Sequence, residues 1–380
     1  MHPVLILLIV SLMPVLAEAA PCVLPDKSGL RLATYNVSLN RKKHGEMYQE
    51  LKSGNSGQAR ALAKVVQQVD PDVLLIQELD KGIKQEVLTA FHDLYLNRAG
   101  KRKVSGFPFR HHFLSNTGAQ TGFDLDRNGH VGGPGDAQGF GWHAGQYGFA
   151  ILSKLPFHVN EISEFRNLLW RDFEDTQISQ VRTQEMPWYG ADSQAVLRLS
   201  SKNHVAIPIQ GPGGLIWILA AHPTPPVFDG PEDRNGIRNY DEIRLLRTMF
   251  EGDRGLINDR GESFKIPSTD DFVVMGDMNA DPRKGDGRPG AIGQLLTHPK
   301  VNIEATVGKF MPKSNDLKLK DPHDTSAFGL RVDYIIPSKT LEVYQSGLCR
   351  AKTNHAKPPS DHFLVWMDVE FKGNKDILSP

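Results

Sequence analysis

Residues 271–281 read Asp271-Phe272-Val273-Val274-Met275-Gly276-Asp277-Met278-Asn279-Ala280-Asp281, an apolar run that ends abruptly in a carboxylate and an amide. Side chains two positions apart in an extended chain lie on the same side, so Asp277 and Asn279 point together at the end of the predicted strand. Such a pair can orient a water molecule, a phosphate oxygen or a metal ion. The alternative is a simple turn, because Gly, Asp and Asn are all turn formers.

The same pattern recurs along the chain, where other predicted strands are followed or preceded by polar residues. Those that follow strands are Asn36, Glu78 and His222, and those that precede strands are Asp333, Asp361 and His362. If the second group of strands runs antiparallel to the first, all of these residues lie at one edge of the sheets. Each residue alone could be a turn, surface or structural residue, but their ordered recurrence indicates a site.

Strands and helices alternate through the chain without an internal repeat. Gln58–Val69 has helical apolar spacing, and a second helix is predicted to open at Asn239, with Glu242 in capping-box register. The last strand, from Phe363, alternates apolar with more exposed positions. We therefore expect one α+β domain over residues 20–380, with two packed mixed or antiparallel sheets flanked by helices and a long insertion at about 97–140.

The N-terminus has the features of an export signal. An apolar run from Val4 to Leu16 is too short to span a bilayer and precedes Ala17-Glu18-Ala19, which has the form of a cleavage site. The residues before the run include His2 but no Lys or Arg. We expect a signal peptide over residues 1–19 and a secreted or periplasmic mature chain.

Net charge and cysteine content exclude few classes of substrate or binding partner. The formal net charge is zero, which argues neither for nor against a nucleic-acid partner. The two cysteines, Cys22 and Cys349, could pair in an oxidising compartment or remain buried thiols. Two cysteines cannot form a thiolate zinc site.

The residue types at the strand ends favour hydrolysis of a phosphoester. Carboxylate and amide oxygens suit a hard cation such as Mg²⁺, Mn²⁺ or Ca²⁺. The histidines are then free for proton transfer near neutral pH. A cation offsets charge on phosphoryl oxygens while a histidine takes a proton from the attacking water.

In order, these motifs resemble the endonuclease/exonuclease/phosphatase superfamily. The motifs are Thr34–Asn36, Asp72–Glu78, Gly148–Ser153, Ala221–Pro223, Gly276–Asp281, Arg331–Ile335 and Ser360–His362. The resemblance extends from about Leu30 to Phe371 and implies a four-layer sandwich of two sheets between helices. It also implies a metal-dependent phosphoric ester hydrolase, although members of the superfamily act on very different substrates.

The resemblance implies a role for each residue of the site. Glu78 is implied as the principal metal ligand, with Asn36 beside it and Asp361 as a further ligand, for Mg²⁺ or alternatively Mn²⁺ or Ca²⁺. His362 is implied as the general base, oriented by Asp333, and Asp277 positions or deprotonates the attacking water. The residues implied to contact the phosphate are Asn279, His222 and Tyr147.

One segment does not match the familiar members of the superfamily. Asp124, Asp126 and Asn128, followed by Gly129, have the D-x-D-x-N-G spacing of a calcium loop. The glutamate expected at the twelfth position is replaced by Gly135, and Asp136 follows it. The segment could bind a structural Ca²⁺ or could be a glycine-rich surface turn.

Two groups of basic residues could contact a substrate. Guanidinium groups pair well with phosphate oxygens, so Arg234, Arg238 and Arg244 could bind a substrate phosphate, or could pair with the acidic residues of the loop after His222. The basic run Arg98–Lys103 could follow a nucleic-acid strand or could be a solvated loop.

We therefore expect an exported, divalent-metal-dependent phosphoester hydrolase, and a phosphodiesterase rather than a monoesterase. Two histidines beside the scissile group would allow both base catalysis and assistance to the leaving group. A secreted nuclease and a phospholipid phosphodiesterase, acting on membrane lipid, are the specific alternatives. The alternative of another class is a non-catalytic phosphate- or calcium-binding protein on the same fold, and no obligate protein partner is inferred.

Overall fold

The computed structural model describes Cys22 and residues 24–97, 106–184, 186–252, 255–315, 319–350 and 358–371. The predicted signal peptide and the basic run Arg98–Lys103 lie outside these residues. Within the described ranges, no helix is both long enough and apolar enough to cross a bilayer.

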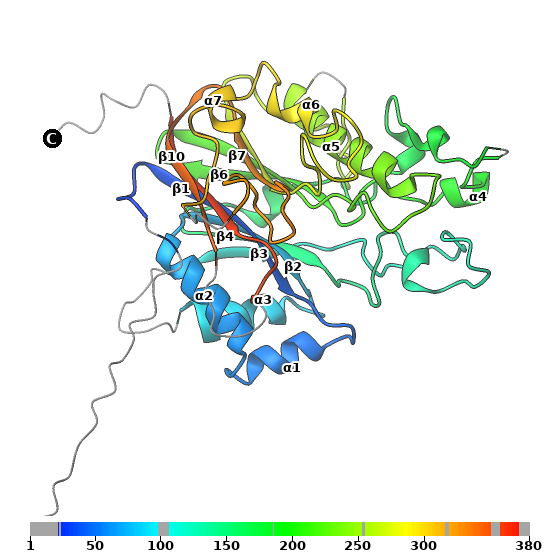
Figure 1. The fold of residues 1–380 in the computed structure, drawn as a ribbon, viewed down its shortest axis with the longest axis horizontal. Coiled ribbons are helices and arrows are strands. Elements are labelled where there is room, and N and C mark those ends of the chain that lie inside the picture. Colours follow the sequence, from blue (N-terminus) through cyan, green and yellow to red (C-terminus); the bar gives the residue numbers. More distant parts are fainter. Residues whose placement is uncertain are drawn as a thin grey trace, which may run out of the picture.

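Two mixed β-sheets form the centre of the molecule (Figure 1). The six-stranded sheet has the order β10 (Leu341–Cys349), β11 (Leu364–Phe371), β1 (Leu30–Leu39), β2 (Val73–Leu79), β4 (Gly148–Ser153) and β3 (Phe109–His112). The five-stranded sheet has the order β5 (Ser163–Glu164), β6 (His204–Gly211), β7 (Gly214–Ala221), β8 (Asp271–Asp277) and β9 (Asp333–Pro337). β1 pairs with β2, and β7 with β8, in parallel, whereas the other pairs are antiparallel.

Helices cover the outer faces of both sheets and complete a four-layer sandwich. The helices are α1 (Glu46–Lys52), α2 (Gly57–Val69), α3 (Glu86–Phe91), α4 (Ala191–Gln194), α5 (Arg234–Glu251), α6 (Gly293–Leu296) and α7 (Ile303–Thr306). In Figure 1, α1–α3 and α5–α7 lie on opposite sides of the sheets. One apolar cluster fills the space between the sheets, and two others lie between a sheet and its helices. The predicted α+β class with two packed sheets is thus confirmed.

Helix α2 confirms the periodicity argument, because its apolar stripe is buried and Ser56 caps its first turn. The alternation predicted for the last strand is wrong. Leu364 and Trp366 of β11 are as buried as the residues between them, because α2 covers the face that was expected to be more exposed.

The predicted start of the second long helix is also wrong. α5 begins at Arg234, so Asn239 and Glu242 lie inside the helix and neither caps it. Both side chains are buried and bind loops of the second sheet. In the sequence, the spacing of a capping box is the same as that of two buried side chains one helical turn apart, so the pattern alone does not distinguish them.

Long-range links join the N-terminal segment to the C-terminal strands. Cys22 and Cys349 form a disulfide with Cα atoms 5.2 Å apart. Arg31 of β1 donates from Nε and Nη2 to the carboxylate of Asp368 on β11, at 2.6 and 2.8 Å, and both side chains are buried. Within the segment 97–140, Phe109–His112 forms β3 at the edge of the six-stranded sheet.

Candidate active site

Bulges at the ends of β1 and β2 redirect Asn36 and Glu78. The pairing of β1 with β2 shifts register between Asn36 and Leu39, and that of β2 with β4 shifts between Gln77 and Leu79. Glu78 adopts a φ of 56°, a left-handed conformation that costs residues other than glycine on the order of 1–3 kcal/mol. Bulges and strained residues of this kind gather at functional sites, because they turn a side chain out of the regular pleat.

A glycine brings the ends of β7 and β8 together. A Cβ atom at Gly276, where φ is 148°, would lie 2.0 Å from the carbonyl oxygen of Ala221, so a larger residue would push the strands apart. This approach places His222 Nε2 3.5 Å from Asp277 Oδ2. The backbone N–H of Asn279 donates to the other Asp277 oxygen at 2.9 Å.

Oδ2 of Asp277 is the centre of the site. Nδ2 of Asn36 donates to it at 3.0 Å, and Nε2 of His362 and Nε2 of His222 lie 3.7 and 3.5 Å away. The same amide nitrogen donates to Oε1 of Glu78 at 3.0 Å. Because β9 and β11 run antiparallel to β8 and β1, residues that precede strands meet residues that follow them, as the sequence predicted.

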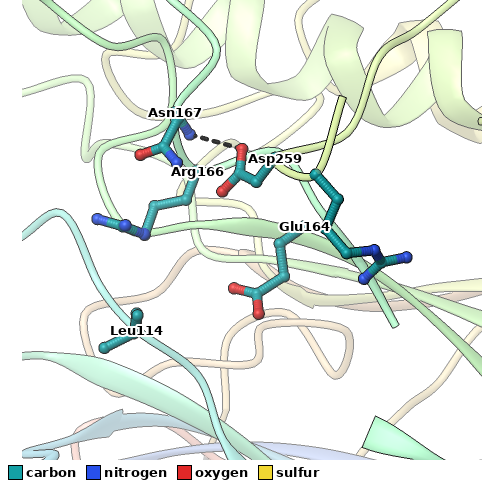
Figure 2. A pocket seen from close by; sticks show the side chains of 6 residues that line it. Leu114, Glu164, Arg166, Asn167 and Asp259 are labelled. Carbon is teal, nitrogen blue, oxygen red and sulfur yellow. Dashed lines mark hydrogen bonds between the residues drawn. The ribbon is translucent and has the colours of Figure 1, made fainter. Parts of the chain in front are cut away.

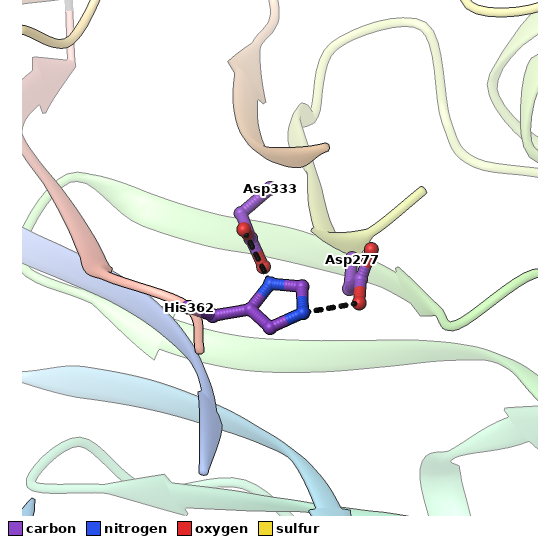
Figure 3. A group of neighbouring side chains, drawn as sticks. All are labelled: Asp277, Asp333 and His362. Atoms are coloured by element: carbon purple, nitrogen blue, oxygen red, sulfur yellow. Dashed lines mark hydrogen bonds and ion pairs between the residues drawn. The ribbon is translucent and has the colours of Figure 1, made fainter. Parts of the chain in front are cut away.

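The imidazole of His362 lies between two carboxylates (Figure 3). Its Nδ1 is 2.9 Å from Oδ2 of Asp333, which also accepts a hydrogen bond from Thr325 Oγ1 at 2.7 Å. Burial disfavours the charged ring, but the charges of Asp333 and Asp277 outweigh it and raise the pKa of His362 to about 10. Burial raises the pKa of Asp277 to about 7. The ring is therefore oriented through Nδ1 and presents Nε2 to the centre of the site.

His222 is a neutral hydrogen-bonding group. Burial, and then the charge of Lys202, lowers its pKa well below the usual range. Its buried Nδ1 has no hydrogen-bond partner in the described parts of the chain. A neutral imidazole carries one N–H, which it can offer to a phosphate oxygen.

Sequence reasoning missed Lys202, whose side chain is among the buried groups of the site. Only 6% of Lys202 is exposed, and its Nζ donates to the carbonyl oxygen of Pro223 at 3.3 Å. Nδ2 of Asn279 donates to the same carbonyl at 3.1 Å. Burial lowers the pKa of Lys202, whereas the charges of Glu242 and then Glu78 act to raise it. Lys202 lies in the polar run 200–203, which from sequence cannot be told from a turn.

Tyr147 and Asp361 flank Glu78 at the rim of the site. Burial, and then the charges of Glu78 and Asp80, raises the pKa of Tyr147, so its phenol keeps its proton. Asp361 is exposed and accepts a hydrogen bond from Ser38 Oγ at 3.1 Å. Asn40 was also missed, although its Nδ2 donates to Oε2 of Glu78 at 3.0 Å.

The donor set fits a hard divalent cation. Burial raises the pKa of Glu78, and one oxygen of Asp333 is buried without a hydrogen-bond partner among the described residues. Carboxylates outnumber the basic groups, so a cation would balance the charge. Glu78, with Asn36 and Asp361, is the expected set of ligands. Ligand atoms of Asp277, Asp333 and His362 lie within 4.8 Å of one another, so these residues offer the cation an alternative position if the His362 ring loses its proton.

The three arginines suggested as phosphate contacts bind protein groups instead, and none donates to the site within the described ranges. Arg234 pairs with Glu232, as the alternative interpretation held. Arg238 is buried and donates to the carbonyl oxygens of Leu199, Gln138 and Arg198. Arg244 donates to the carbonyl oxygens of Glu174 and Asp175, and to Asp241.

The suggested calcium loop brings carboxylates together. Ligand atoms of Asp124, Asp126 and Asp136 lie within 4.8 Å of one another. Asp136, one position beyond the usual twelfth residue, is fully buried and accepts from the backbone N–H groups of Leu125, Gly132 and Gly133. Asn128 donates its backbone N–H to Asp124 at 3.0 Å, as in a tight turn, so both interpretations of the loop remain compatible with its shape.

The structure contains a cavity of about 210 Å³ lined by residues other than those of the catalytic cluster (Figure 2). It is lined by Leu114, Glu164, Arg166, Asn167, Asp259 and Arg260, none of which belongs to the site predicted from sequence. Burial raises the pKa of both Glu164 and Asp259.

The fold and the site together define a two-sheet protein with a His–Asp pair and an acidic edge whose donors suit a divalent cation. The chain belongs to the endonuclease/exonuclease/phosphatase family, whose sequence profile matches residues 33–362. Members of this family are phosphoester hydrolases and generally use divalent metals. No curated protein matches the chain.

Several solved structures are similar over most of the chain. An endonuclease/exonuclease/phosphatase protein from Beutenbergia cavernae is 14% identical with a TM-score of 0.48, over 90% of this chain and 71% of that one. The human Nocturnin catalytic domain is 16% identical with a TM-score of 0.47, over 91% and 96%. D. rerio TDP2, complexed with a single-strand DNA product, is 14% identical with a TM-score of 0.46, over 90% and 98%. At this level of similarity, a neighbour's substrate does not identify the substrate of this chain.

Proposed function

We propose that the protein is an exported, divalent-metal-dependent phosphodiesterase. The observation that carries the proposal is the carboxylate oxygen of Asp277, which faces His222 at 3.5 Å, His362 at 3.7 Å and Asn36 at 3.0 Å. These distances bring two imidazoles and an amide to one small polar centre, where a water and a phosphate can be held together.

His362 takes the proton of the attacking water. The charges of Asp333 and Asp277 hold the ring protonated, and a bound cation would offset them so that the ring can become neutral. Asp333 binds Nδ1 of the neutral ring, which leaves Nε2 as the acceptor and stabilises the imidazolium that forms. Asp277 lies on the same side and holds the water by hydrogen bonding. The proton therefore moves from water to Nε2 of His362 as the water oxygen bonds to phosphorus, while the ester oxygen–phosphorus bond breaks and the alkoxide leaves.

His222, Asn279 and Lys202 stabilise charge on the phosphoryl group. The neutral ring of His222 and the amide of Asn279 donate hydrogen bonds, and the buried ammonium of Lys202 adds positive charge. A divalent cation held by Glu78, Asn36 and Asp361 would supply Lewis acidity for a phosphoryl or leaving oxygen. Two histidines at one phosphate, one as base and one as donor, suit a diester.

Hydrolysis of bis(4-nitrophenyl) phosphate by the purified mature protein, with Mg²⁺, Mn²⁺ or Ca²⁺ and with a chelator, tests the proposal. His362→Ala is expected to lower kcat by about 10²–10⁴-fold, the usual contribution of a general base. His158→Ala, at an exposed histidine, is the matched control and should leave the rate unchanged. Equal or faster turnover of 4-nitrophenyl phosphate, a monoester, would overturn the diester assignment. Absence of any phosphoester hydrolysis with all three ions would favour the non-catalytic binding protein.

The export part of the proposal is supported by the apolar N-terminal run and by the disulfide between Cys22 and Cys349, because such bonds persist in oxidising compartments. N-terminal sequencing of protein recovered from the periplasm or medium is expected to begin near Ala20. An uncleaved chain confined to the cytoplasm would contradict export without affecting the catalytic proposal.

A further inference from the structure

Exposed aromatic rings and a lysine form a platform on the segments that follow β1 and precede β4. The platform consists of Trp142, Phe140 and Lys42. Trp142 is 50% exposed and Phe140 57% exposed, and their ring centroids lie 6.4 Å apart at a steep angle. Nζ of Lys42 lies 3.9 Å from the centroid of the Trp142 ring. No carboxylate pairs with Lys42 or with its neighbour Lys43 within the described chain.

Buried hydrogen bonds hold the platform in place. The backbone N–H of Trp142 donates to Oε1 of Gln146 at 2.7 Å, and Nε2 of Gln146 donates to the carbonyl oxygen of Arg41 at 2.9 Å. Gln146 is 1% exposed, so this amide connects the segment of Trp142 to that of Lys42 away from water. The rings are thus presented on an ordered support.

The support is continuous with the catalytic cluster. Asn40, which donates to Glu78, is two residues from Lys42, so their Cα atoms lie within roughly 7 Å. Asp80, two residues after Glu78, accepts the backbone N–H groups of both Arg41 and Tyr147. A group bound on Trp142 would therefore belong to a part of the substrate adjacent to the scissile phosphate.

We propose that this platform binds a nucleobase of single-stranded nucleic acid and that the substrate of the proposed phosphodiesterase is such a strand. A half-exposed indole stacks on any base, since every base has a π-face, and the adjacent lysine ammonium groups attract the phosphates that flank the base. Sequence-independent stacking beside a cationic loop fits a single strand, whose bases are free, better than a duplex.

The arrangement disfavours insertion of the same rings into a lipid bilayer. One face of Trp142 carries the Lys42 ammonium, so burying the ring in hydrocarbon would bury a charge or break the contact. The backbone N–H of Trp142 also donates to the buried amide of Gln146, which restricts how far the ring can move from the protein. Phe228, 89% exposed on the loop after His222, has neither constraint and provides a matched control.

The test compares a thymidine oligonucleotide with an abasic strand of equal length and charge. For the wild type, kcat/KM for the thymidine strand should exceed that for the abasic strand by about five- to a hundredfold. Trp142→Ala should reduce this ratio to near one, Trp142→Phe should restore part of it, and Phe228→Ala should leave it unchanged. Lys42→Ala should reduce the salt dependence of log K for oligonucleotide binding by about 0.7. Rates with bis(4-nitrophenyl) phosphate should stay the same in all four variants.

Binding of the labelled strands, measured by fluorescence anisotropy in a chelator, separates this inference from the proposed function. If Trp142→Ala binds the thymidine strand as tightly as the wild type does, the inference fails, whether or not the diester is hydrolysed. Loss of binding to phosphatidylcholine–sphingomyelin vesicles in Trp142→Ala, with oligonucleotide binding unchanged, would overturn it in favour of a lipid surface. If the platform discriminates bases but the wild type hydrolyses no phosphoester, only the proposed function fails.

Discussion

Replacing Glu242 by alanine is expected to destabilise the protein and to slow hydrolysis, although Glu242 belongs to a helix outside the catalytic cluster. The carboxylate is fully buried on α5. Oε1 accepts from the backbone N–H and the hydroxyl of Ser201, at 2.6 and 2.8 Å, and Oε2 accepts from the N–H of Thr224 at 2.6 Å. Ser201 precedes Lys202, and Thr224 follows Pro223, so one side chain connects two segments of the site.

The magnitude follows from the donors that lose a partner. Without the carboxylate, the N–H groups of Ser201 and Thr224 are buried and unpaired, at about 1–3 kcal/mol each, whereas the serine hydroxyl can rotate. We expect the free energy of unfolding to fall by about 2–6 kcal/mol. Because Pro223 accepts from both Lys202 and Asn279, a shift of about 1 Å in its segment should lower kcat about a hundredfold.

Urea denaturation and the kcat for bis(4-nitrophenyl) phosphate, both measured at 25 °C, check this expectation. Glu242→Gln keeps one acceptor and should lose less stability than Glu242→Ala. Glu251→Ala, which removes a carboxylate paired with Arg247 and His298 near the end of the same helix, should cost no more than about 1 kcal/mol. A loss below about 0.5 kcal/mol in Glu242→Ala, with kcat unchanged, would refute the positioning role.

Three further measurements follow from the fold. Asp368→Ala leaves the buried Arg31 guanidinium without its carboxylate. This change should lower the free energy of unfolding by about 3–5 kcal/mol in urea denaturation. A double variant, Arg31→Met with Asp368→Leu, should recover most of that loss. Reduction of the disulfide should destabilise the wild type by about 2–5 kcal/mol in thermal unfolding. The reductant should not affect the stability of Cys349→Ser, and an equal effect on both proteins would contradict a stabilising role of the disulfide. If the loop with Asp124, Asp126 and Asp136 holds Ca²⁺, a hundredfold excess of the ion over its Kd should stabilise the protein by about 2.7 kcal/mol and raise its melting temperature. Asp136→Asn should abolish this rise. An unchanged melting temperature in the wild type would favour the surface-turn interpretation.

Long periodic segments and strand ends were readable from sequence because both depend on local patterns. The helix Gly57–Val69 and the polar residues around Asp277 follow from spacing along the chain alone. Asn239 and Glu242 were misread because the same one-turn spacing serves a helix cap and a pair of buried side chains. The extra exposure predicted in the last strand failed because a covering helix cannot be inferred from the strand itself.

The sequence by itself therefore determines which chemical groups the site contains. Carboxylates, amides and histidines lie where strands begin or end, and antiparallel pairing of the strands brings them to one edge. Which basic groups serve that site depends on contacts between segments far apart in the chain. Arg238 is committed to backbone carbonyls, whereas Lys202, in an unremarkable polar run, is buried beside the cluster. Likewise, Trp142 becomes a neighbour of Lys42 only through the buried amide of Gln146. Strand patterns arise from local geometry, but the burial and partners of a side chain arise from packing, which no single segment of sequence contains.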